Sequence, residues 1–140
     1  MNSELIALWG AVLSTLLALV KIWEVWSARR RIEISYSFMG VPEEGNDIII
    51  RNISDKPFIV TFWELQFCEK KLLRWVPYKT ESPDEYNQDM CIQGHSTKTL
   101  NFSNHYYFEW GHKYLAGKRI YLKLYIAGKR KPVRYFVYKG

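Results

Sequence analysis

An apolar stretch near the N-terminus constrains this chain more than any other feature. It reads LIALWGAVLSTLLALVKIWEVW over Leu5–Trp26 and carries no charge before Lys21. A helix over this stretch would be about 33 Å long at about 1.5 Å per residue, which matches the roughly 30 Å hydrocarbon core of a bilayer. Trp9 and Trp23 stand near its two ends, where indole rings favour the membrane interfaces. We therefore predict a single-pass transmembrane helix over residues 5–27.

The charges that flank this stretch predict its orientation. Arg29, Arg30 and Arg31 follow it, whereas residues 1–4 contain no lysine or arginine. Positive residues close to a transmembrane end stay on the cytoplasmic side, so residues 1–4 should be extracytoplasmic and residues 28–31 should act as a basic stop at the cell (inner) membrane. A cleaved signal peptide fits less well, because it needs a positive region before the apolar run. A buried core helix is the other alternative.

Small residues form a stripe along the predicted helix. Gly10, Ser14 and Ala18 are spaced at i, i+4 and i+8, which places them on one helical face. Small residues let helix backbones approach closely in lipid, so the stripe predicts a homo-oligomer or docking onto a partner membrane helix. The alternative is a chance arrangement, because small residues are common in membrane helices.

The remaining chain, residues 32–140, is long enough for one domain with its own core. Apolar and polar residues alternate with period two in several short runs, and turn residues separate the runs. Residues 103–115 are ambiguous, and their aromatic part, 106–110, suits a strand or one helical turn. The pattern predicts an all-β, antiparallel cytoplasmic domain with strands near residues 32–38, 47–51, 58–68, 72–78, 90–92, 98–102, 119–126 and 132–138.

This layout resembles immunoglobulin-like domains in its architecture. The resemblance is carried by the strand–turn–strand unit Ile48–Phe62, with its polar turn at Asn52–Pro57, and by the closing hairpin Arg119–Tyr138. It implies an immunoglobulin-like β-sandwich over most of residues 32–139. The two cysteines, Cys68 and Cys91, do not fit the inter-sheet disulfide of that family. No function follows from the resemblance, because one fold hosts many functions.

The sequence contains no recognisable catalytic or metal-binding pattern. Cys91, His95, His105 and His112 are the nearest approach to a ligand set, but their spacing matches no closed zinc site. No phosphate-cradling glycine motif occurs, and no nucleophile–base arrangement can be recognised from spacing. We therefore expect neither enzyme activity nor a metal or cofactor.

Charge is distributed unevenly along the chain. The net charge is +6, yet residues 110–140 contain nine basic residues and no acidic one. Alternation over residues 119–126 directs the apolar side chains to one face and the polar side chains to the other, and the next strand pairs with this one. The predicted ligand-binding residues on the polar face are Arg119, Tyr121, Lys123 and Tyr125, with Arg134 on the pairing strand joining them if the register allows.

A basic surface of this kind has three open interpretations. It can bind phosphate groups while its aromatic side chains stack on the rings of a ligand. It can contact anionic lipid headgroups, or it can be a solvated face without a ligand. Reversing Arg119 and Lys123 to Glu should leave folding nearly intact, because exposed charges contribute little to stability, and should abolish binding to any phosphate-bearing partner.

These features together predict a membrane-tethered, non-enzymatic sensor or adaptor. It would bind an anionic ligand, such as a nucleotide or another phosphate-bearing molecule, and would self-associate through its helix; we do not expect nucleic acid as a partner. Small single-pass proteins of this layout are similar in architecture to the membrane effectors of bacterial antiviral systems. The alternative is a structural or assembly subunit of a larger membrane protein complex.

Overall fold

The computed structural model describes residues 3–27, 32–83 and 89–140. The chain divides into two compact units, residues 1–30 and 31–140. In the first unit, α1 (Ser3–Ser27) is one unbroken helix that is long and apolar enough to cross a membrane. Near its C-terminal end Lys21 Nζ lies 2.6 Å from Glu24 Oε2, a pairing that the three-residue spacing permits.

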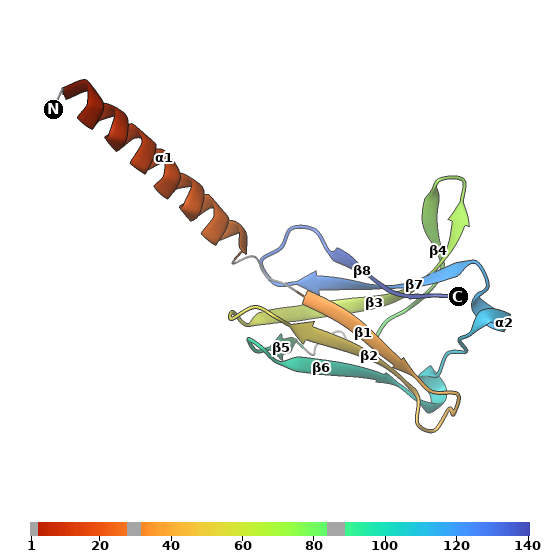
Figure 1. Cartoon of the computed structure of the whole chain (residues 1–140). Coiled ribbons are helices and arrows are strands. Elements are labelled where there is room, and N and C mark those ends of the chain that lie inside the picture. Colours follow the sequence, from red (N-terminus) through yellow and green to blue (C-terminus); the bar gives the residue numbers. More distant parts are fainter. Residues whose placement is uncertain (1–2, 28–31, 84–88) are drawn as a thin grey trace. The chain divides into compact units, whose positions relative to one another are not determined.

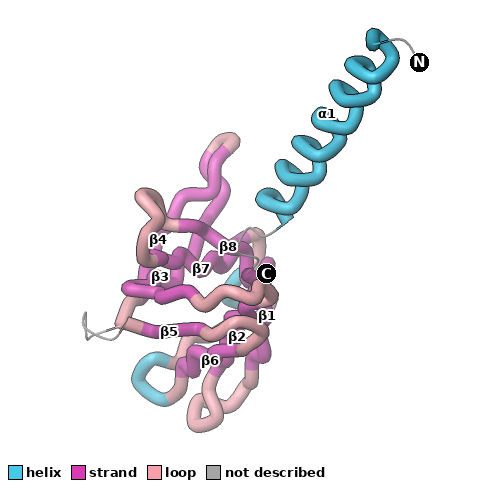
Figure 2. Tube along the Cα trace, turned by 90° about the vertical axis from the view of Figure 1, so that its left-hand side faces the viewer, coloured by secondary structure: helices cyan, strands magenta, loops and turns pink. Residues whose placement is uncertain are grey.

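The second unit consists mainly of two antiparallel sheets that face each other in a sandwich-like arrangement (Figure 1). One sheet has three strands in the order β1-β2-β6, and the other has five, with β4-β3-β7-β8 in order and β5 pairing beside β3. Figure 2 shows that strands make up most of the unit. The strands are β1 (Ile32–Phe38), β2 (Asn46–Asn52), β3 (Phe58–Lys71), β4 (Arg74–Glu81), β5 (Met90–Ile92), β6 (Thr97–Phe102), β7 (Lys118–Ile126) and β8 (Val133–Lys139).

The core lies between the sheets and follows the alternation of the sequence. In β7 every second residue is buried, and in β2 the same pattern buries Ile48 and Ile50. A register shift at Thr61 in β3 changes which side chains face inward: Val60 is buried before it, and Leu65 is buried after it. Because of this bulge, β3 presents Phe62, Glu64, Gln66 and Cys68 to the outer face of the five-stranded sheet.

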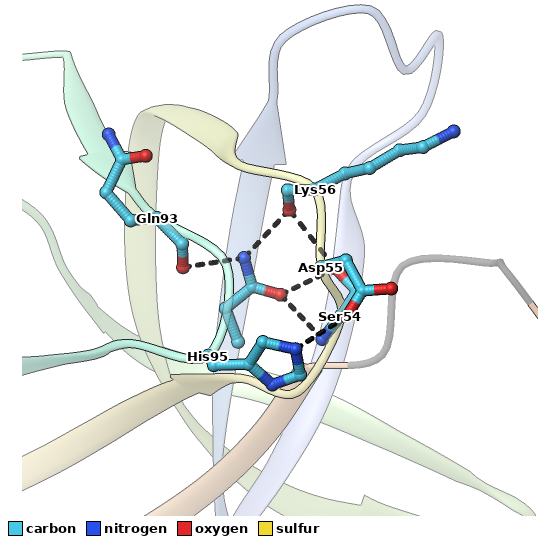
Figure 3. A network of polar contacts seen from close by, with 6 residues as sticks. Ser54, Asp55, Lys56, Gln93 and His95 are labelled. Carbon is cyan, nitrogen blue, oxygen red and sulfur yellow. Dashed lines mark hydrogen bonds and ion pairs between the residues drawn. The ribbon is translucent and has the colours of Figure 1, made fainter.

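A fully buried asparagine joins the two sheets at one end of the domain. Asn52 closes β2, and its Nδ2 donates hydrogen bonds to the backbone oxygens of Lys56 (2.9 Å) and Gln93 (2.9 Å). Its Oδ1 accepts hydrogen bonds from the backbone N–H (3.0 Å) and the hydroxyl (2.7 Å) of Ser54. The turns that follow β2 and β5 are therefore joined by these hydrogen bonds, as Figure 3 shows.

A second buried asparagine acts in the same way at the other end of β2. The Nδ2 of Asn46 donates to the backbone oxygen of Phe108 at 2.7 Å, and its Oδ1 accepts the N–H of Met39 at 3.1 Å. These bonds satisfy backbone groups that a buried irregular segment would otherwise leave unpaired. The segment from 107 to 110 is neither a strand nor a helix, and it lies between η1 (Asn104–Tyr106) and α2 (His112–Leu115).

The strand predictions agree closely with the structure except around the β3–β4 hairpin. The sequence predicted a strand beginning at Leu72, whereas Leu72 and Leu73 form the two-residue turn between Lys71 and Arg74. The strand predicted to end at Tyr78 also continues further, because β4 extends to Glu81.

Candidate functional site: a cationic, aromatic sheet face

The outer face of the five-stranded sheet brings all five predicted ligand-binding residues together. Arg119, Tyr121, Lys123 and Tyr125 alternate with the buried residues of β7. The register pairs Lys123 with Arg134 and Tyr121 with Phe136, so β8 adds a cation and a ring to the same face. We call this surface the cationic face and define it by Trp75, Arg119, Tyr121, Lys123, Tyr125, Arg134 and Phe136.

Two arginines on the cationic face are stacked against aromatic rings. The Arg134 guanidinium carbon lies 4.0 Å from the ring centre of Tyr121, and that of Arg119 lies 4.2 Å from the ring centre of Trp75. The Arg119 Nη1 also donates to the Tyr121 hydroxyl at 3.3 Å. Stacking fixes a planar guanidinium in orientation while its N–H groups point along the plane, where they can meet phosphate or carboxylate oxygens.

Lys123 is held by a carboxylate from the neighbouring strand. Its Nζ lies 3.0 Å from Glu64 Oε2, and the Tyr125 hydroxyl donates to Glu64 Oε1 at 3.1 Å. The hydrogen bond with Tyr125, followed by the contact with Glu64, raises the pKa of Lys123 above its usual value, although partial burial opposes the shift. Lys123 is therefore charged at neutral pH and has a defined position.

A cysteine thiol completes the buried part of the site. Cys68 is fully buried beneath the cationic face, and the Arg134 Nη2 lies 3.4 Å from its Sγ. Burial raises the pKa of the Cys68 thiol, and the positive charge of Arg134 only partly offsets this. The thiol therefore stays protonated and acts as a small apolar side chain with a weak acceptor.

The cationic face is less exposed than a solvated basic surface would be. The side chains of Lys123 and Glu64 are 27% and 20% exposed, and Arg119 Nε is buried with no hydrogen-bond partner among the described residues. The expectation that reversing Arg119 and Lys123 would hardly affect folding rested on exposure, and for Lys123 that premise is wrong. The sequence signalled the face through alternation but gave no sign that Glu64, Trp75 or Phe136 belongs to it.

A separate pocket of about 630 Å³ opens where β3, β5 and β6 approach one another. Its lining includes Trp63, Met90, Leu100 and Phe102, with Lys98 as a cationic member. Phe62 lines the pocket and also contacts the ring of Tyr125, with the ring centres 5.5 Å apart. Sequence reasoning missed this pocket, because its walls come from strands that are distant along the chain.

The histidines are dispersed over the described residues. His95 pairs with Asp55, with Nε2 2.6 Å from Oδ1, and it links the turn after β2 to the turn after β5 (Figure 3). His105 lies in η1 and packs against Tyr106, and His112 begins α2. Within residues 3–27, 32–83 and 89–140, no group of three or more His, Cys, Asp or Glu side chains could hold a metal ion.

The predicted membrane-association residues divide into two groups. Gly10, Ser14 and Ala18 all lie in α1 and are exposed. Nothing lies within 4 Å of a Cβ built at Gly10, so the helix itself leaves this position open. Arg29, Arg30 and Arg31 lie outside the described residues.

Comparison with known proteins adds no family to these observations: no protein-family model matches the chain, and no curated protein matches it.

Proposed function

We propose that this chain is a membrane-tethered, non-enzymatic sensor or adaptor that binds an anionic ligand on its cationic face. The observation that carries the proposal is the pair of stacked guanidinium groups, Arg119 on Trp75 and Arg134 on Tyr121, on one sheet face. Both arginines are oriented before any ligand arrives, so binding would cost little further side-chain entropy. The exposed ring of Phe136, 50% accessible, offers a stacking surface beside them.

A phosphate-bearing molecule with a ring, such as a nucleotide, suits this arrangement best. Its phosphates would accept hydrogen bonds from the guanidinium groups of Arg119 and Arg134, and its ring would pack on Phe136 or Tyr121. Lys123 would contribute little to ligand binding, because Glu64 already pairs with its ammonium group and offsets most of its charge. Catalysis forms no part of this proposal, since the face offers no pairing of a nucleophile with a general base.

The membrane part of the proposal concerns α1. The helix would cross the cell inner membrane, with the arginines at 29–31 holding the sandwich, of the immunoglobulin-like type, in the cytoplasm. Contacts through Gly10, Ser14 and Ala18 would allow self-association. Ligand binding on a cytoplasmic domain would then be coupled to association of membrane helices, which is the arrangement of bacterial antiviral membrane effectors.

A structural subunit of a larger membrane complex is the second candidate. One specific observation favours it: the cationic face already satisfies much of its own charge, through Glu64 with Lys123 and through ring stacking on the arginines. Surfaces of this kind, rich in Arg, Tyr and Trp, are also typical of the centres of protein–protein interfaces. In that case the partner would be permanent and no small ligand would be needed.

Thermal unfolding with a panel of nucleotides separates the two candidates. A ligand that binds only the folded state raises the melting temperature of the full chain in detergent as its concentration exceeds Kd. We expect at least one nucleotide to do so, and we expect Arg119→Gln combined with Arg134→Gln to abolish the shift. Arg51→Gln, on the other sheet, is the matched control and should keep it. No shift with any nucleotide would favour the structural subunit.

Orientation is tested independently of the ligand. A C-terminal reporter that is active only in the cytoplasm should give a strong signal, and replacement of the three arginines at 29–31 by Glu should produce mixed orientations. A strong signal from a reporter that is active only outside the cytoplasm would contradict the proposed topology.

A further inference from the structure

The tip of the β3–β4 hairpin exposes two large apolar side chains. Leu72 is 96% accessible and Leu73 is 95% accessible, the highest values among the large apolar side chains in the described part of the chain. Pairing between β3 and β7 ends at Glu69, so the last part of the hairpin is a two-stranded ribbon. Figure 1 shows this hairpin leaving the body of the sandwich, beside the label β4.

The backbone of the tip gives no structural reason for a leucine. Leu72 has φ of +54°, a left-handed conformation in which glycine or asparagine is the ordinary choice and a side chain with a Cβ is strained. Leu72 and Leu73 alone connect Lys71 with Arg74, which face each other across the hairpin. An apolar side chain here helps neither the turn nor solubility, so its use must lie outside the folded domain.

Basic residues surround the two leucines. Lys70 and Lys71 precede them and Arg74 follows them, all with exposed side chains. Lys71 is paired with Glu69 at 3.0 Å, which leaves the segment with an excess of positive charge. An apolar tip within a ring of cations is complementary to an anionic bilayer surface, because leucine enters the acyl boundary while lysine and arginine stay at the headgroups.

From this complementarity we infer that the hairpin is a second membrane contact. Leu72 and Leu73 insert into the interface of an anionic bilayer, and Lys70, Lys71 and Arg74 contact the headgroup phosphates. The inference rests on the proposed membrane helix. Residues 28–31 can separate the end of α1 from the start of β1 by no more than about 18 Å in any conformation, so the start of β1 stays close to the lipid.

The test places an environment-sensitive fluorophore at the hairpin tip of the full chain in nanodiscs. Cys91→Ser removes the exposed thiol, Cys68 is buried, and Leu72→Cys then supplies the labelling site. The matched control carries Arg130→Cys in the β7–β8 connection, whose residues Lys129, Arg130 and Lys131 are basic but not apolar. Two lipid compositions are compared, phosphatidylcholine alone and phosphatidylcholine with phosphatidylserine.

We expect the Leu72 probe to shift to the blue and to be quenched by spin-labelled lipid when phosphatidylserine is present, while the Arg130 probe remains in water. Adding Lys70→Glu and Arg74→Glu should remove the effect. A probe at position 72 that stays in water in both lipid compositions overturns the inference. A blue shift that depends on protein concentration and not on lipid composition also overturns it, because it would indicate a second copy of the chain as the partner. Extraction of the same samples at alkaline pH reports separately whether α1 is an integral membrane segment. Failure of the proposed membrane helix is thereby distinguished from failure of the proposed contact between the hairpin and the lipid.

Discussion

The outer faces of the two sheets have opposite characters although both are made by strands that alternate. The three-stranded sheet presents short polar side chains, among them Ser35, Thr99 and Asn101, and one exposed ion pair between Glu33 and Arg51 at 3.2 Å. The five-stranded sheet presents arginine, lysine and large rings that contact one another. The polar side chains of the first face can be satisfied by water alone, whereas the second face is rich in the arginine and aromatic residues that are enriched at interfaces.

The two faces differ in the burial of their charged side chains as well as in composition. Both faces contain an ion pair, but the side chains of Glu33 and Arg51 are each 49% exposed, whereas those of Glu64 and Lys123 are 20% and 27% exposed. Partial burial makes the second pair a fixed element of structure, and an exposed pair of the first kind contributes little. Substitutions that are matched between the two faces test this difference.

Charge reversal should give the largest difference in stability between variants of the two faces. Lys123→Glu places a second carboxylate beside Glu64 in a partly buried position, and we expect it to lower the free energy of unfolding by about 2–3 kcal/mol. Arg51→Glu makes the equivalent change beside Glu33 on the exposed face and should cost less than about 1 kcal/mol. Denaturant unfolding of both variants measures the contrast; equal losses would mean that the two faces do not differ in this respect.

Removal of a stacking ring should have a smaller effect. Trp75→Ala takes away the ring on which Arg119 lies at 4.2 Å, and we expect a loss of about 1–2 kcal/mol from the cation–π contact and the apolar area together. Thr99→Ala on the opposite sheet should change stability by less than about 0.5 kcal/mol. A Trp75 variant as stable as the wild type would show that the stack contributes nothing.

The smallest effect concerns pH. Burial raises the pKa of Cys68 above its ordinary value of 9.0, so between that value and the folded-state pKa the unfolded chain has lost a proton that the folded chain keeps. Stability should therefore fall as pH rises through this window. The fall should be shallower in Cys68→Ala than in Cys91→Ala, as thermal unfolding on either side of pH 9 would show. Identical slopes would contradict the assignment.

The sequence predicted most of the strands because their alternation is local. The run Ile120, Leu122, Leu124, Ile126 specifies both that β7 is a strand and which of its faces is buried, and this also placed Arg119 and Lys123 together. It could not specify what lies opposite them. Glu64 reaches the same face because of the bulge at Thr61, and no local pattern shows a bulge of this kind.

Two other features depended on long-range packing. Residues 107–110 are irregular, and Asn46, far away in the chain, satisfies the backbone oxygen of Phe108. Leu72 and Leu73 match the pattern of a strand, yet they form a turn in which Leu72 adopts a positive φ that its residue type disfavours. The local preference and the hairpin register conflict there, and the pairing of β3 with β4 prevails.

We propose that ligand binding takes place on the cationic face and not on the face of the three-stranded sheet. Hydroxyl-radical footprinting of the full chain measures side-chain accessibility on both faces, with and without the nucleotide that most raises the melting temperature. We expect oxidation of Phe136 and Tyr121 to fall when the nucleotide is added, while oxidation of Ile49 on β2 stays constant. Protection of Ile49, or unchanged oxidation of Phe136 at saturating nucleotide, would contradict it.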